Sequence, residues 1–141
     1  MIEFNFETNF ELNNESNLQK WISGIIISEG FELGEIVYIF CNDEYLHKLN
    51  VEFLDHDTLT DVISFDYSLG KQINGEIYIS VERVADNAKD FKTNFENELH
   101  RVMIHGILHF CGYKDKSELH EQTMRDKEDE SLETLISFIG N

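Results

Sequence analysis

The chain is organised around one stretch, HGILHFCGYKD, which runs from His105 to Asp115. Side chains four residues apart lie on the same face of an α-helix, so His105 and His109 can present two imidazoles to one ion. Gly112 follows where a helix often ends in a left-handed residue, and the resulting turn carries Asp115 back toward both histidines. The spacing predicts three metal ligands, which leave one position of a four-coordinate zinc ion open, as catalytic zinc sites require.

The third ligand and the identity of the metal have alternatives. His120 competes for the third position, but it falls in a predicted terminal helix, and we favour Asp115 because the turn after Gly112 delivers it. Two histidines and one carboxylate also form the ligand set of non-haem Fe(II) enzymes, so zinc is preferred over iron without iron being excluded. A single histidine on an apolar helix is usually a buried, hydrogen-bonded side chain, whereas the combined spacing favours a metal.

Residues near the two histidines restrict the chemistry. Zinc peptidases with this histidine spacing place a glutamate directly after the first histidine as the general base, and Gly106 occupies that position here. The pattern counts against peptide cleavage, although a bound metal would still lower the pKa of water. Glu98 lies two turns before His105 on the same helical face and is a candidate to support the site, but a surface carboxylate is the commoner role and is our expectation.

Length and composition favour a single domain spanning residues 1–141. A chain of 141 residues that is 41% hydrophobic and 12% aromatic can bury a substantial core. Its apolar runs fall far short of the roughly 20 residues that a membrane helix needs, and the start of the chain, MIEFN, has no signal-peptide pattern. We therefore expect a cytoplasmic monomer without a membrane partner, in which Cys41 and Cys111 stay reduced.

The charge of the chain is strongly acidic. With 28 acidic and 11 basic residues its formal net charge is −17, which repels polyanions at long range. A nucleic-acid substrate would require a local group of cations, the metal itself, or presentation on a larger assembly. Arg101, Lys114 and Lys116 are the cations closest in sequence to the predicted ligands.

Hydrophobic periodicity predicts the secondary structure. Apolar alternation at residues 2–6 and apolar runs at 36–41, 62–67 and 76–79 predict four strands, the last two joined as a hairpin by a turn at 68–75. Helical spacing predicts a helix over residues 18–26, and further helices after a cap at Asn42, a cap at Ser80, a capping box at 93–96 and a cap at Ser117.

The helix that carries both histidines is nearly apolar all round from residue 102 to residue 110, which predicts that it is buried at the centre of the domain. The strands concentrate in the first half of the chain and the helices in the second. We therefore expect an α+β fold in which a mostly four-stranded mixed sheet is covered by helices, with the strand order left undetermined.

Three ordered blocks resemble the YbeY family of bacterial metal-dependent endoribonucleases, also called rRNA maturation factors. HGILHFCGY at 105–113 is similar to the family signature, TDVISF at 60–65 to a second block, and GEIYIS at 75–80 to a third. Asp61 and Ser64 belong to the second block, where they either line a substrate cleft or serve as turn and capping residues.

The resemblance implies a zinc-dependent, single-strand-specific endoribonuclease with one zinc ion per chain, acting in small-subunit rRNA 3′-end maturation and ribosome quality control. It implies rRNA and the small ribosomal subunit as partners, and the acidic charge of the chain adds a basic ribosomal protein as another candidate partner. Two family ligands fall on His105 and His109, whereas Asp115 replaces the usual third histidine, a ligand that zinc accepts. Leu54 replaces an arginine usual in the family, so either another cation such as Arg101, Lys114 or Lys116 contacts phosphate instead, or RNA cleavage is weak.

Two alternative functions are retained. One is a non-catalytic ribosome assembly factor in which the metal stabilises the loop after Gly112, and the other is a different metal-dependent hydrolase. The acidic composition fits a basic protein partner better than naked RNA.

Overall fold

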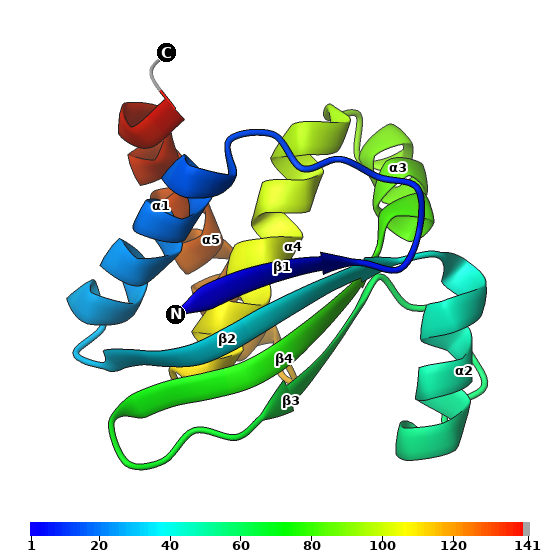
Figure 1. The fold of residues 1–141 in the computed structure, drawn as a ribbon, viewed down its shortest axis with the longest axis horizontal. Helices are drawn as coiled ribbons and strands as arrows, with labels where there is room; N and C mark the ends of the chain where they lie inside the picture. Colours follow the sequence, from blue (N-terminus) through cyan, green and yellow to red (C-terminus); the bar gives the residue numbers. More distant parts are fainter. Residues whose placement is uncertain (140–141) are drawn as a thin grey trace.

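A computed structural model describes residues 1–139 as a four-stranded sheet with helices packed on it (Figure 1). Its elements are β1 (Ile2–Phe6), α1 (Glu15–Ser28), β2 (Glu32–Cys41), α2 (Asp43–Leu54), β3 (Val62–Asp66), β4 (Gln72–Ser80), α3 (Val81–Asp90), α4 (Phe95–Phe110) and α5 (Glu118–Ile139). The strand order is β1-β2-β4-β3, with β1, β2 and β4 parallel and β3 antiparallel to β4. The predicted α+β class, mixed sheet and hairpin are confirmed.

Strands β2 and β4 are longer than their hydrophobic patterns predicted. Their polar first residues, Glu32 and Gln72, pair with each other, which extends both strands beyond the apolar runs. Where the register shifts between Leu33 and Ile36, the side chain of Asn74 accepts a hydrogen bond from the backbone N–H of Glu35 at 2.8 Å. The predicted turn at 68–75 is therefore too long, because part of it belongs to β4.

The helix caps agree with the sequence at three of four positions. Predicted caps are confirmed where a side-chain oxygen accepts a hydrogen bond from a backbone N–H three residues on, at Asn42, Ser80 and Ser117. The capping box at 93–96 is wrong by one residue, because Asn94 caps α4 and accepts from the N–H of Asn97 at 2.7 Å. The N–H of Thr93 instead donates to the carbonyl of Ala88 and closes the end of α3.

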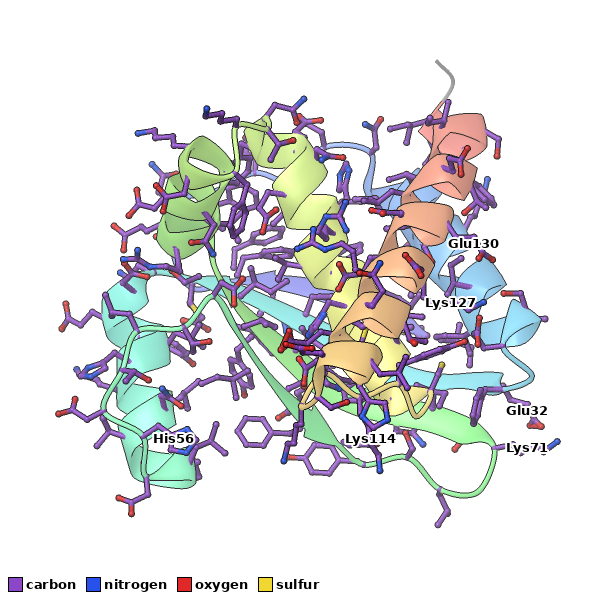
Figure 2. The ribbon with its side chains drawn as sticks, turned by 180° about the vertical axis from the view of Figure 1, so that it is seen from behind. Glu32, His56, Lys71, Lys114, Lys127 and Glu130 are labelled. Carbon is purple, nitrogen blue, oxygen red and sulfur yellow. The ribbon has the colours of Figure 1, made fainter. Side chains whose placement is uncertain are left out.

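Helix α4 lies between the sheet and α5, as Figure 2 shows from the helix side. Tyr38 on β2 donates its hydroxyl hydrogen to the carbonyl of Met103 at 2.9 Å, and Trp21 on α1 donates to the carbonyl of Ser131 on α5 at 2.8 Å. The buried apolar residues of α4 go round the helix, as predicted: Leu99, Val102, Met103, Ile104, Ile107, Leu108 and Phe110. This packing makes α4 a rigid support for side chains that project from it.

The opposite face of the sheet carries a smaller cluster. Cys41, Leu46 and Ile63 form it, where α2 packs beside β2 and β3. Leu54, which stands where the resemblance led us to expect an arginine, ends α2 and is 42% exposed. Within residues 1–139 no helix combines the length and apolar character needed to cross a bilayer.

Two helical glycines differ in the space around them: Gly24 has room for a side chain, whereas Gly106 is packed closely against Ile77. We therefore expect substitution by alanine to have opposite effects on stability at the two positions. A Cβ on Gly24 would approach Phe138 no closer than 4.0 Å, so Gly24→Ala should stabilise the fold by about 1 kcal/mol through helix propensity. A Cβ on Gly106 would lie 2.9 Å from Cδ1 of Ile77, and overpacking costs about 1–3 kcal/mol, which outweighs the same propensity gain. We expect thermal denaturation to show a higher Tm for Gly24→Ala and a lower Tm for Gly106→Ala. A rise in both would contradict the close packing of α4 on β4.

Candidate metal centre

Helix α4 and the turn after it bring the three predicted ligands together. Gly112 has φ of 103°, a left-handed conformation that turns the chain back at the end of α4. Oδ2 of Asp115 lies 3.3 Å from Nε2 of His105 and 3.2 Å from Nε2 of His109. In the part of the chain that the structure describes, these residues form the one group of three or more histidine, cysteine or acidic side chains whose ligand atoms lie within 4.8 Å of one another.

The donor spacing suits a tetrahedral zinc ion. Ligand bonds of about 2.0–2.1 Å at tetrahedral angles separate the donor atoms by about 3.3–3.4 Å, close to the two distances from Asp115. The donors are two imidazole nitrogens and one carboxylate oxygen, which zinc accepts. His120, the alternative third ligand, is exposed on α5 and lies outside this group.

A carboxylate that the sequence analysis missed holds the other ring nitrogen of His105. Oε2 of Glu128 lies 2.6 Å from Nδ1 of His105, and its Oε1 lies 2.9 Å from Nη1 of Arg101. Because a carboxylate only accepts, the proton of the neutral imidazole sits on Nδ1, and the lone pair of Nε2 faces Asp115. Carboxylates in this position orient metal-binding histidines.

Glu128 could have been found by helical spacing. It stands in the charged run 125–130, which suggests a solvent-exposed face, yet its side chain is only 7% exposed. The buried residues of α5 are Met124, Glu128, Ser131 and Leu135, spaced as one helical face. A carboxylate on such a face requires a buried partner, and Arg101 and His105 provide it.

The environment of His105 favours its protonated form when no metal is bound. Burial lowers the pKa of His105, but the hydrogen bond and charge of Glu128, together with the charges of Asp115 and Asp61, outweigh burial and leave the pKa raised. A metal ion at Nε2 therefore competes with a proton, as is general for histidine ligands.

The turn after α4 is held by a second set of polar contacts. The hydroxyl of Tyr113 donates to Glu29 at the end of α1 with a distance of 2.7 Å, and Nζ of Lys127 lies 3.2 Å from the same carboxylate. Lys127 projects from α5 (Figure 2) and lies 5.9 Å from the centre of the Tyr113 ring. These contacts join α1, α5 and the turn that positions Asp115.

Two cavities adjoin the metal centre. One has a volume of about 650 Å³ and the other about 300 Å³, and both are lined by His105, Asp115, Arg125 and Glu128. Asp61 lines the smaller cavity, where its carboxylate accepts a hydrogen bond from Asn87 at 3.4 Å. Ser64, the other candidate from that block, lies within β3 opposite Ile77 and lines neither cavity.

The three predicted phosphate-binding cations are not equivalent in the structure. Arg101 lines the smaller cavity, but its guanidinium is paired with Glu128 at 2.9 Å and with Asp129 at 2.7 Å. Lys114 and Lys116 are exposed on the turn and line neither cavity (Figure 2 labels Lys114).

Glu98 is buried beside the metal centre, so the expectation of a surface carboxylate is wrong. It is 5% exposed and lines the smaller cavity together with Asp61. Burial raises the pKa of Glu98, with the charge of Asp61 acting in the same direction, and burial also raises the pKa of Asp61. Two carboxyl groups with raised pKa therefore stand in one wall of the cavity.

The raised pKa of Glu98 predicts a pH-dependent gain from its amide. A carboxyl group whose pKa is higher in the folded state than in the unfolded state stabilises the fold while it is protonated. This contribution is fully present below the unfolded-state pKa of about 4.3, and it is lost as the pH rises through the folded-state pKa. At pH 7 the fold therefore bears the cost of a buried charge. In thermal denaturation with chelator, Glu98→Gln should raise Tm at pH 7, and the gain should shrink toward pH 4. The exposed control Glu133→Gln should change Tm less, and equal gains would contradict this account.

Comparison with known proteins finds one family. A sequence profile described as Endoribonuclease YbeY matches residues 3–136. A protein of Flavobacterium johnsoniae named Endoribonuclease YbeY is 62% identical over 132 residues, which cover 94% of this chain and 95% of that protein. A protein of the same name from Flavobacterium psychrophilum is 61% identical, with coverage of 94% of both chains. The solution structure of TM1509 from Thermotoga maritima has a TM-score of 0.71 and 28% sequence identity, and the match covers 97% of this chain and 90% of that one.

Proposed function

The chain belongs to the YbeY family of endoribonucleases, and from this we propose that it cleaves single-stranded RNA at one zinc ion held by His105, His109 and Asp115. Membership of the family makes the chain a hydrolase that acts on RNA. The observation that carries the metal assignment is the convergence of both Nε2 atoms on Oδ2 of Asp115, at 3.3 and 3.2 Å.

Zinc bound at these residues would polarise a phosphodiester oxygen and lower the pKa of a water molecule. The chain contributes the geometry. His105 and His109 project from a helix that is buried over most of its surface, so their spacing is fixed before a metal binds. Glu128 holds Nδ1 of His105 and keeps Nε2 available, while Gly106 lets α4 approach Ile77 and leaves no room for the glutamate that peptidases use. The two cavities beside His105 and Asp115 give substrate access to the open side.

The biological setting of this activity is part of the proposal. The protein acts as one domain, residues 1–141, in the cytoplasm, in the 3′-end maturation of small-subunit rRNA and in ribosome quality control. It works as a monomer on rRNA in the small ribosomal subunit. The 28 acidic residues far outnumber the 11 basic ones, which favours presentation of the RNA on an assembly rather than capture of free RNA by long-range attraction.

A second candidate is supported by the net charge of −17. In this alternative the metal stabilises the turn after α4, and the acidic surface binds a basic ribosomal protein without RNA cleavage.

One experiment separates the two. Purified protein is analysed for its metal content, prepared both in air and anaerobically, and incubated with a single-stranded RNA oligonucleotide with and without chelator. The nuclease proposal expects zinc at one equivalent, cleavage that stops with chelator, and recovery on addition of zinc. Cleavage that continues in the presence of chelator, or no cleavage by protein that contains one equivalent of metal, would contradict the nuclease proposal. Iron in place of zinc would overturn the choice of metal.

A further inference from the structure

Arg125 on α5 lines both cavities beside the proposed metal site. Of the residues that the structure describes, four line both cavities: Arg125, His105, Asp115 and Glu128. Two of these four are proposed metal ligands, and the third holds a ligand through a hydrogen bond of 2.6 Å. A substrate that enters either cavity therefore lies in a space that Arg125 lines together with the proposed ligands His105 and Asp115.

The guanidinium of Arg125 has no carboxylate partner among residues 1–139. Glu121, one helical turn earlier, lines the larger cavity as well, yet no ion pair within 4.0 Å joins the two. Among the described residues, Arg101 is the other arginine or lysine that lines these cavities, and it is paired with Glu128 and Asp129. Lys127, farther along α5, is paired with Glu29 and Glu130. Among residues 1–139, Arg125 is thus the arginine or lysine in these cavity walls that has no paired carboxylate and can bind an anion.

The charge of Arg125 acts on the buried carboxyl group of Glu98. Burial raises the pKa of Glu98, and the charges of Arg101 and Arg125 both act against that rise. Arg101 has two carboxylate partners of its own, whereas the charge of Arg125 is not neutralised by a paired carboxylate in the described residues.

The remaining walls are unfavourable to a polyanion. Glu118, Glu121, Asp115 and Glu128 all line the larger cavity. A phosphate group away from the metal therefore needs a compensating cation, and a guanidinium suits this because it donates two parallel hydrogen bonds to phosphate oxygens.

We propose that Arg125 binds a phosphate group of the RNA strand beside the metal centre and so positions the strand for cleavage. This inference rests on the proposed function, because it names the contact through which that same site holds its substrate. Arg125 lies outside the ligand set, so its loss should leave zinc binding intact.

The test compares Arg125→Gln with the wild type and with Lys116→Gln. Both substitutions remove one positive charge from an exposed residue near the site, but Lys116 lines neither cavity. Binding of a 2′-O-methyl RNA oligonucleotide, recovered intact after the measurement, to zinc-loaded protein is measured over a range of KCl concentrations, and cleavage of the matching RNA is measured in parallel. We expect Arg125→Gln to weaken binding by about 10-fold to 100-fold, since a charge-assisted hydrogen-bonded contact is lost.

The salt dependence gives a readout that a purely structural role would not change. Loss of one phosphate contact should reduce the slope of log K against log[KCl] by about 0.7 for a single strand. Arg125→Lys should keep this slope and lose part of the affinity, because it retains the charge without the paired hydrogen bonds. Zinc content and Tm should match the wild type in both variants.

Three outcomes would overturn the inference: wild-type binding and cleavage by Arg125→Gln, an equal loss in Lys116→Gln, or an unchanged salt slope. Failure of the proposed function looks different. In that case zinc-loaded wild-type protein binds the oligonucleotide but does not cleave RNA, while the comparison of binding between wild type and Arg125→Gln still decides the role of Arg125.

Discussion

His109→Ala protein is expected to lose its equivalent of zinc and to cleave single-stranded RNA at least about 1000-fold more slowly than the wild type. Two ligands from His105 and Asp115 cannot hold zinc as three do. Without the metal, the pKa of water stays at its high bulk value instead of being lowered by zinc, so little hydroxide is available at neutral pH. Metal analysis after dialysis and initial cleavage rates under saturating RNA measure the two effects.

The fold should survive this substitution. The side chain of His109 is 31% exposed, and its one side-chain hydrogen bond among the described residues goes to Asp115. His56→Ala is the matched control, because His56 is an exposed histidine beyond the end of α2, away from α4 and α5 (Figure 2). It should retain both zinc and activity. A His109→Ala protein that keeps one equivalent of zinc, or that cleaves RNA at the wild-type rate, would show that the metal is held elsewhere.

The grouping of the three proposed ligands could be predicted because it depends on local geometry. The spacing of His105 and His109 is a property of any α-helix, and Gly112 adopts the left-handed conformation expected at the end of α4. The turn that follows is short enough to place Asp115 without knowledge of the rest of the fold. The central position of α4 was predictable for a similar reason, since an apolar surface all round a helix has to be buried.

The contacts that cross the fold could not be predicted in this way. Glu128 is separated from His105 by 23 residues, and their hydrogen bond depends on how α5 crosses α4. Glu98 shares a cavity wall with Asp61 through the packing of α4 beside β3, a relation between elements that periodicity does not contain. The strand order is a property of the same kind, because polar residues such as Glu32 and Gln72 become strand residues only by pairing with each other.

We expect a second large effect when the carboxylate of Glu128 is removed, namely a loss of metal affinity. One of its oxygens accepts from Nδ1 of His105 and the other from Arg101, so both acceptor positions are used. In Glu128→Gln one of these oxygens becomes an NH₂ group, which cannot accept from either partner. An amide can therefore satisfy His105 or Arg101, but not both. We expect zinc affinity to fall by about 10-fold to 100-fold, the usual cost of disturbing the hydrogen-bond partner of a metal-binding histidine.

Glu128→Ala should lose more, because it also leaves the guanidinium of Arg101 without its partner in a site where the side chain of Arg101 is only 17% exposed. Competition titration with a chromophoric chelator measures the affinity, and ¹⁵N chemical shifts of the His105 ring report which nitrogen carries the proton. In the wild type that proton should sit on Nδ1, and in Glu128→Ala the preference should weaken.

Asp129→Asn distinguishes orientation of His105 from general electrostatics. It removes the same charge and disturbs the same arginine, since Asp129 lies 2.7 Å from Nη2 of Arg101, but it leaves the contact between Glu128 and His105 in place. If Glu128 acts by orienting His105, Asp129→Asn should keep nearly all of its zinc affinity and the wild-type proton position. If instead both variants lose affinity equally, the negative charge near the site is what matters, and the hydrogen bond to Nδ1 has no separate role. The structure favours the first result, because the side chain of Asp129 is 57% exposed, where water screens its charge, whereas that of Glu128 is 7% exposed and in direct contact with a ligand.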